Sequence, residues 1–278
     1  MLERVDKKKI ITSLITLVAA GALLVGATIA FFTDQETSQD NVFAAGSLDL
    51  KVDYDCYYNK IADDDPNCPW DDSSWEETDL GPQHKFFNFN DIKPGDFGEG
   101  TISLHVYNND AWGRLVISDV QDLENTYLQA ELDAGDAGVP DGELRENLGF
   151  RIWLDQGQTV GFQGTEDEGE GDNIWQQGDE PVLVTQGTVD LGGETHNIWQ
   201  GLSAVYVAES CTTVDGNAGG DCPGIAQDGR LVGSVTYYFG IDWELPDTVG
   251  NEVQTDSLSA DMTFEVVQHR NNPGKTGF

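Results

Sequence analysis

The sequence is poor in basic residues. It contains 14 lysines and arginines against 50 aspartates and glutamates, which gives a formal net charge of −36. This balance excludes nucleic acid as a partner, because proteins bind the phosphate backbone mainly through lysine and arginine. The same charge keeps copies of the chain apart in solution and attracts divalent cations or basic surfaces.

The sequence also lacks the motifs of the common hydrolases. It has no HExxH and no GxSxG, and no histidine lies on a predicted helix with an acid or a second histidine at metal-ligand spacing. Carboxylate pairs for glycoside hydrolysis cannot be singled out among 50 acids. No period of 20 to 50 residues recurs, which disfavours a solenoid or a propeller. We therefore assign no catalytic and no cofactor-binding residue, and the sequence favours a protein that is not an enzyme.

Cysteine is scarce, and its four copies fall into two local pairs. Cys56 and Cys68 lie in one loop, and Cys211 and Cys222 lie in another, each rich in glycine, proline or aspartate. Neither pair has CxxC spacing or a histidine nearby in sequence, which disfavours zinc. We predict the disulfides Cys56–Cys68 and Cys211–Cys222, as expected for a chain that meets oxidising conditions.

One long hydrophobic run is present, from Ile10 to Ala30, and it follows three lysines at positions 7–9. A basic flank, an uncharged core and small residues at the end are typical of a signal peptide, and we place the cleavage between Ala30 and Phe31. A retained transmembrane anchor is the alternative, because 21 residues of helix can cross a bilayer core of roughly 30 Å. Either way, the prediction is an extracellular or cell-surface protein whose membrane contact is confined to residues 10–30.

The rest of the sequence is typical of β-structure. Hydrophobic residues make up 38% of the chain and aromatic residues 10%, enough for a packed core. Leu48, Leu50, Val52 and Tyr54 alternate with polar residues and predict a half-buried strand over residues 46–55. Further strands are predicted at 102–107, 114–120, 149–154, 182–185, 198–208, 231–243 and 258–266, with one short helix over 140–147.

These elements predict an all-β protein, an antiparallel β-sandwich with long acidic loop insertions. The pattern alone does not separate jelly-roll from immunoglobulin-like topology. We expect an N-terminal signal or transmembrane helix over residues 1–30, a linker over 31–45 and one sandwich domain over 46–278. The irregular stretch at about 155–180 reads as an insertion at a sandwich edge.

That insertion carries the best metal-binding candidate. Carboxylates and glycines alternate there, a composition that supplies hard oxygen ligands and lets a loop wrap Ca²⁺. The spacing differs from that of an EF-hand, and a solvated acidic loop is the alternative. The candidate calcium ligands are Glu166, Asp167, Glu168, Glu170, Asp172, Asn173, Asp179 and Glu180.

The start of the exported part resembles a known family. Residues 30–38 read AFFTDQETS and residues 41–50 read NVFAAGSLDL. Residues 91–96 read DIKPGD, and a predicted strand ends at Asn108-Asn109. This order of motifs resembles the TasA/camelysin family, whose pattern is FFSDTETS, then N-x-F-x-A-G-x-L-D-L, then D-L-K-P-G-D. The resemblance covers roughly residues 20–110.

The resemblance implies export through a SipW-like signal peptidase, a jelly-roll domain and self-association into extracellular matrix (biofilm) fibres. In such fibres the N-terminal segment of one subunit adds as a strand to its neighbour, and Phe31, Phe32, Val42 and Phe43 would be the apolar residues of that donor strand. The alternative is that the segment is a frayed tail or the first strand of its own domain.

Two other functions stay open from the sequence. Some members of the family carry a metallopeptidase label, so a camelysin-like secreted metallopeptidase is one alternative, although no zinc-binding pattern supports it here. A calcium-stabilised surface adhesion module is the other.

Overall fold

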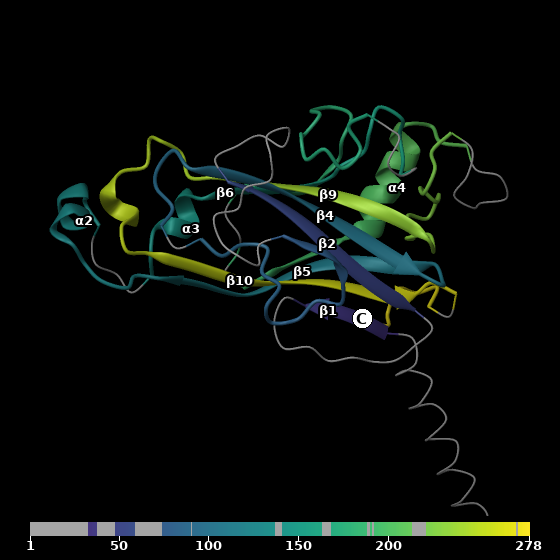
Figure 1. Cartoon of the computed structure of the whole chain (residues 1–278), viewed down its shortest axis with the longest axis horizontal. Coiled ribbons are helices and arrows are strands. Elements are labelled where there is room, and N and C mark those ends of the chain that lie inside the picture. The colour runs from purple at the N-terminus through teal and green to yellow at the C-terminus, as the bar shows by residue number, and fades with distance from the viewer. Residues whose placement is uncertain are drawn as a thin grey trace, which may run out of the picture.

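The computed structural model describes residues 33–37, 48–58, 74–89, 91–136, 141–162, 168–187, 190, 192–212, 221–270 and 272–278. In these ranges most residues with regular structure lie in antiparallel strands, and the helices are few and short (Figure 1). The all-β prediction is therefore confirmed, while the jelly-roll connectivity stays a prediction. The predicted signal or transmembrane helix lies outside the described residues. Within the described ranges, no helix combines the length and apolarity needed to cross a membrane.

The strands form two sheets in which every pair is antiparallel. The six-stranded sheet has the order β3 (Trp75–Thr78), β2 (Asp49–Tyr58), β4 (Phe97–Tyr107), β9 (Val235–Glu244), β6 (Gly149–Leu154) and β7 (Val182–Gly187). The four-stranded sheet has the order β1 (Thr33–Thr37), β10 (Ser257–Gln268), β5 (Ala111–Leu123) and β8 (Glu194–Asn197).

The sheets face each other across one core, and Figure 1 shows β2, β4 and β9 in one layer and β10, β5 and β1 in the other. The core follows from the period of two, since alternate side chains of a strand point to the same face. Leu50 and Val52 of β2 are fully buried. Phe239 of β9 and Phe264 of β10 join the layers, with ring centroids 5.8 Å apart.

One strand of the core needs glycine for packing. The indole of Trp153 lies against the backbone of β9, and a Cβ atom on Gly240 would lie 2.0 Å from its Cζ2 atom. A residue with a side chain would displace the indole, which is why a strand so rich in aromatic residues carries a glycine at its centre.

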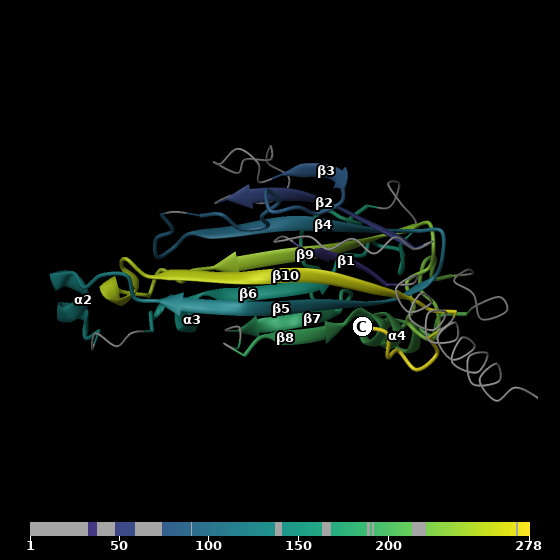
Figure 2. The same cartoon turned by 90° about the horizontal axis from the view of Figure 1, so that it is seen from below.

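The helices lie at the ends of the molecule. Figure 2 shows α2 (Gln129–Ala134) at one end of the long axis and α4 (Ile198–Ala208) toward the other. The helix predicted over 140–147 is present as α3 (Leu144–Asn147), and the short 3₁₀ helix η1 (Asn251–Val253) precedes β10.

The strand predicted over residues 198–208 is wrong, because this segment forms α4. Its β-branched residues suggested a strand, but Ile198, Leu202 and Val205 recur at helical spacing and are the buried residues of the helix. Packing of one helical face therefore outweighs the local preference for β-structure.

Candidate functional site

The N-terminal strand β1 lies at an edge of the four-stranded sheet and pairs with β10 of its own chain. The register runs from Thr33 opposite Val267 to Thr37 opposite Thr263. Its sequence, TDQET, is wholly polar. In this structure the segment thus serves as the first strand of its own domain.

The partner strand β10 is well covered on both faces. Met262, Phe264 and Val266 belong to the core, and on the other face Val267 is also buried. Glu265, on that other face, pairs with Arg114 of β5. The main contribution of β1 is therefore to pair the backbone N–H and C=O groups at the β10 edge. Without β1 these groups would have no partners in the sheet.

The apolar residues predicted for the donor strand cannot be placed. Phe31 and Phe32 precede β1 directly, Val42 and Phe43 follow it, and all four lie outside the described residues, as does the predicted cleavage site after Ala30. Their role stays a prediction.

Six of the eight predicted calcium ligands lie in the described part of the chain, and they differ in burial. Glu166 and Asp167 lie outside the described residues. The described group of three potential metal ligands with atoms within 4.8 Å of one another contains none of the eight. Glu168 and Asp179 are exposed, Glu170 and Asp172 are half-buried, and Asn173 and Glu180 are buried.

Glu180 anchors the loop instead of facing solvent. It is 5% exposed, its Oε1 accepts the backbone N–H of Gln156 at 2.7 Å, and its Oε2 accepts that of Gln176 at 2.9 Å. Burial, with the adjacent Asp155 carboxyl group adding to it, raises the pKa of Glu180 to about 9. Both of its oxygens thus have donors within the chain.

Asp155 completes a buried carboxyl pair with Glu180, to which it is hydrogen-bonded. Asp155 is fully buried and accepts the backbone N–H groups of Gly171 at 3.2 Å and Asn173 at 2.8 Å. Burial raises the pKa of Asp155 to about 7. Two buried carboxyl groups in contact share a proton near neutral pH, since two charges there would repel each other.

The side chain of Asn173 fixes the same loop to the six-stranded sheet. With the amide oriented to pair both of its groups, its NH₂ donates to the carbonyl of Gly100 in β4 at 2.6 Å and its oxygen accepts the Gly100 N–H at 2.9 Å. Asn173 therefore has a structural role, and this loop is a built part of the domain.

A carboxylate cluster that sequence reasoning missed lies at the α2 end of the molecule. Glu124 follows β5, Glu143 precedes α3 and Asp256 precedes β10, and one oxygen of each lies within 4.8 Å of the others. Asp256 also accepts the N–H groups of Glu143 and Leu144. Burial and then the charge of Asp256 raise the pKa of Glu124 to about 7. By ligand type this group could hold a divalent cation.

Of the two predicted disulfides, one has both of its cysteines in the described part of the chain. Cys211 and Cys222 form a disulfide, as predicted. Cys56 is buried and disulfide-bonded. Its predicted partner, Cys68, lies outside the described residues.

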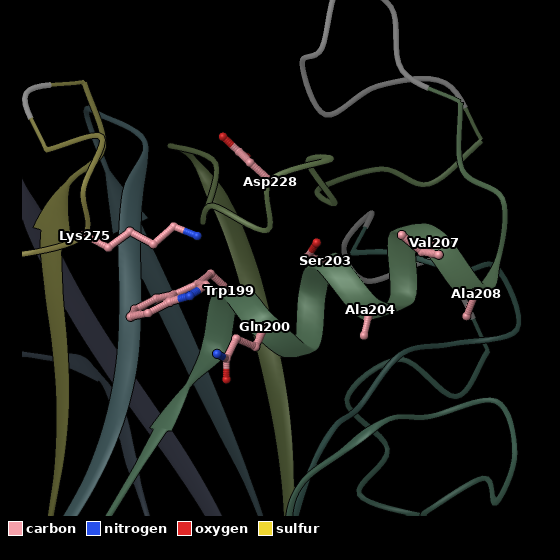
Figure 3. Close-up of a pocket in the computed structure, with 8 residues that line it drawn as sticks. All are labelled: Trp199, Gln200, Ser203, Ala204, Val207, Ala208, Asp228 and Lys275. Carbon is pink, nitrogen blue, oxygen red and sulfur yellow. The ribbon is translucent and has the colours of Figure 1, made fainter.

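A surface hollow of about 640 Å³ runs along the outer side of α4 (Figure 3). At one end the Lys275 ammonium lies 5.2 Å from the Trp199 ring, which also stacks on Phe278 with centroids 5.6 Å apart. Asp228, on the rim, is hydrogen-bonded to Arg230 and His269. These contacts hold the C-terminal residues against α4 and give the hollow a structural role.

The four histidines lie in different parts of the fold, two of them in strands and two outside regular elements, and each has a partner. His84 accepts the N–H of Gly81 through its Nδ1. The other three lie 2.7 to 3.0 Å from a carboxylate oxygen. The three pairs are His105–Asp53, His196–Glu194 and His269–Asp228.

Together these features define an acidic, disulfide-bonded protein of two antiparallel sheets whose first strand lies on a sheet edge. Residues 6–65 match the family model described as camelysin metallo-endopeptidase. Over this part of the chain the resemblance to the TasA/camelysin family is confirmed. No curated protein matches the chain.

Proposed function

We propose that the protein is an exported structural protein that assembles into extracellular fibres, in which β1 of one subunit pairs with β10 of the next. The position of β1 supports this proposal best. It is the first described strand, it lies at a sheet edge, and within the sheets it pairs with β10. Such a strand can change subunits without rearrangement of the other strands.

The hydrogen bonds of the β1–β10 ladder do not distinguish a strand of the same chain from a strand of a neighbouring subunit. A hydrogen bond contributes about 0.5–1.5 kcal/mol net, and β1 adds only polar residues to the sheet. The same bonds form whether β1 comes from its own chain or from a neighbour, so the backbone term cancels. Concentration, and the apolar residues that flank β1 in sequence, would then decide between monomer and fibre.

Export is supported by the sequence and the family match. The uncharged run after the N-terminal lysines, the disulfide Cys211–Cys222 and the acidic composition all suit a protein outside the cell. The match over residues 6–65 includes this run and all of β2.

The test compares three proteins by electron microscopy and sedimentation, each with and without calcium. They are residues 31–278, residues 46–278, and residues 31–278 carrying Gln35→Pro, which removes an N–H and disrupts the strand at its centre. We expect filaments from the first protein alone. Circular dichroism confirms that the other two are folded. Filaments from residues 46–278, or dispersed particles from all three at high concentration, would overturn the proposal.

Peptidase activity is the second candidate, and the description of the matching family as a metallo-endopeptidase favours it. That description applies to the family, and the four histidines of this chain lie in separate parts of the fold. Casein zymography with and without a chelator tests it. Chelator-sensitive hydrolysis by the purified protein would establish a metallopeptidase, whatever the outcome of the fibre assay.

A further inference from the structure

Side chains from four neighbouring strands meet around His105 on the outer face of the six-stranded sheet. Its Nε2 lies 2.7 Å from Asp53 Oδ2 of β2. Its Nδ1 lies 3.1 Å from Thr236 Oγ1 of β9 and 3.8 Å from Glu77 Oε2 of β3. The His105 side chain is 16% exposed, so it is partly accessible to solvent and can exchange protons with it.

The neutral imidazole is satisfied without Glu77. Its Nε2–H donates to Asp53, and its Nδ1 accepts the hydroxyl hydrogen of Thr236. Protonation adds a hydrogen to Nδ1, so the ring then has two N–H groups. The Thr236 hydroxyl must rotate so that its oxygen faces the new N–H, and the Glu77 carboxylate is the anion nearest to Nδ1. The imidazolium then lies between carboxylates of β2 and β3, and both contacts become charge-assisted.

The strand that gains from this contact is weakly held by its backbone. β3 has four residues, lies at the sheet edge and pairs with β2 at two positions, with an irregular register between them. Side chains supply further attachment: the Tyr107 hydroxyl donates to Glu77 Oε1 at 2.7 Å, and the Trp75 ring packs on Tyr54. The Lys51–Asp79 pair and the hydrogen bond from the Cys56 N–H to Ser74 hold its two ends, so the His105–Glu77 contact is one of several side-chain contacts that attach β3.

We propose that His105 is a proton-operated clamp on the edge strand β3. When protonated, it fastens β3 to the sheet through Glu77; when it loses the proton, β3 loosens and the backbone edge of β2 becomes accessible. The clamp would control whether this sheet edge is covered, independently of the β1 edge.

The described charged groups near His105 are mainly acids. Lys51 of β2, the nearby cation, is bound to Asp79 and Asp49. Other titratable groups near it, among the described residues, include Asp53 and Asp55 of β2, Glu76 and Glu77 of β3, Tyr107 of β4 and Tyr238 of β9. Farther along the same face, Arg151 of β6 is paired with Asp242 of β9.

Hydrogen exchange measured by mass spectrometry tests the clamp on the full chain. Histidine titrates near pH 6.5 in peptides, so the protection of the Trp75–Thr78 amides, corrected for intrinsic rates, is compared at pH 5.5 and 7.5. Loss of a partly exposed ion pair changes an opening equilibrium constant by about two- to fivefold. We therefore expect the protection of these amides to be lower by that factor at pH 7.5 than at pH 5.5. His105→Gln should remove the difference. His196→Gln, which breaks a comparable pair with Glu194 in β8, should retain it.

A second variant keeps the proposal falsifiable if His105→Gln is poorly folded. Glu77→Gln retains an oxygen for the Tyr107 hydroxyl and removes the anion, so it should also remove the pH dependence. Equal protection of β3 at both pH values in the unmodified protein would overturn the proposal. So would the unmodified pH dependence in a folded His105→Gln or Glu77→Gln variant.

Discussion

The buried carboxyl pair Asp155–Glu180 makes the stability of the domain sensitive to alkaline pH. Both pKa values are raised by burial above those of exposed acids, to about 7 and about 9. The folded state therefore binds more protons than the unfolded state once pH exceeds about 4.5. The sign follows from linkage: stability is highest at low pH within the folded range and falls as pH rises toward 9.

The magnitude follows from the shared proton. While the folded state holds one proton that the unfolded state has lost, the free energy of unfolding falls by about 1.36 kcal/mol per pH unit. Counting this one proton, the free energy of unfolding falls by about 4 kcal/mol between pH 5 and 8, and by about 2 kcal/mol if the loop relaxes as the charge develops.

Glu180→Gln is the perturbation that isolates this pair. The amide cannot ionise, so less than half of the fall in stability should remain. The variant should be about 1–2 kcal/mol less stable at pH 5, because an amide has one acceptor oxygen for the two N–H groups of Gln156 and Gln176. Asp179→Asn removes an exposed neighbouring charge and is the matched control, which should follow the unmodified protein.

Urea denaturation at pH 5, 6, 7, 8 and 9 in constant high salt measures these free energies, since salt screens the general repulsion of the acidic surface. The curves of the unmodified protein and Glu180→Gln should converge as pH rises. A flat pH profile for the unmodified protein, or an unchanged slope in Glu180→Gln, would refute the reasoning.

Three further predictions concern other parts of the fold. Glu124→Gln should stabilise the protein by about 0.5–1 kcal/mol at pH 8, because it relieves repulsion in a cluster that solvent partly screens; a loss of stability in urea titration would contradict this. Gly240→Ala should lower the melting temperature by several degrees, since its Cβ would overlap the Trp153 indole; an unchanged melting temperature would contradict the packing. Cys211→Ser should cost about 2–3 kcal/mol, because the bond to Cys222 closes a short loop in the unfolded chain, and a loss below 0.5 kcal/mol would show that the bond is dispensable.

The sequence was sufficient for the elements that bury one face. In β2 and β10 a period of two places Leu50, Val52, Phe264 and Val266 in the core, as predicted. It failed for α4, where β-branched residues hide a helical period. The sequence also did not distinguish the strand β1 from a linker, because a polar edge strand lacks the alternation of apolar and polar residues.

The sites were harder to predict than the strands for a physical reason. Glu124, Glu143 and Asp256 are distant in sequence and meet only through the fold. Glu180 is a candidate calcium ligand by sequence because it follows an acidic run, and in the structure it accepts two backbone N–H groups and contacts Asp155. Composition identifies a loop rich in acids, but burial decides which of them are structural.

Crosslinking between subunits is the most direct test of fibre assembly through β1. Gln35 lies opposite Glu265 across the β1–β10 pair, and Cα atoms of opposed residues are about 4.5–5.5 Å apart, within reach of a disulfide. Gln35→Cys and Glu265→Cys proteins are mixed under assembly conditions, oxidised and analysed on non-reducing gels. Ser259→Cys, on β10 beyond the paired stretch, replaces Glu265→Cys in the control. We predict covalent dimers in the first mixture and none in the control. A disulfide that forms only when both cysteines are in one chain would show that β1 stays in its own subunit and would contradict the proposed assembly.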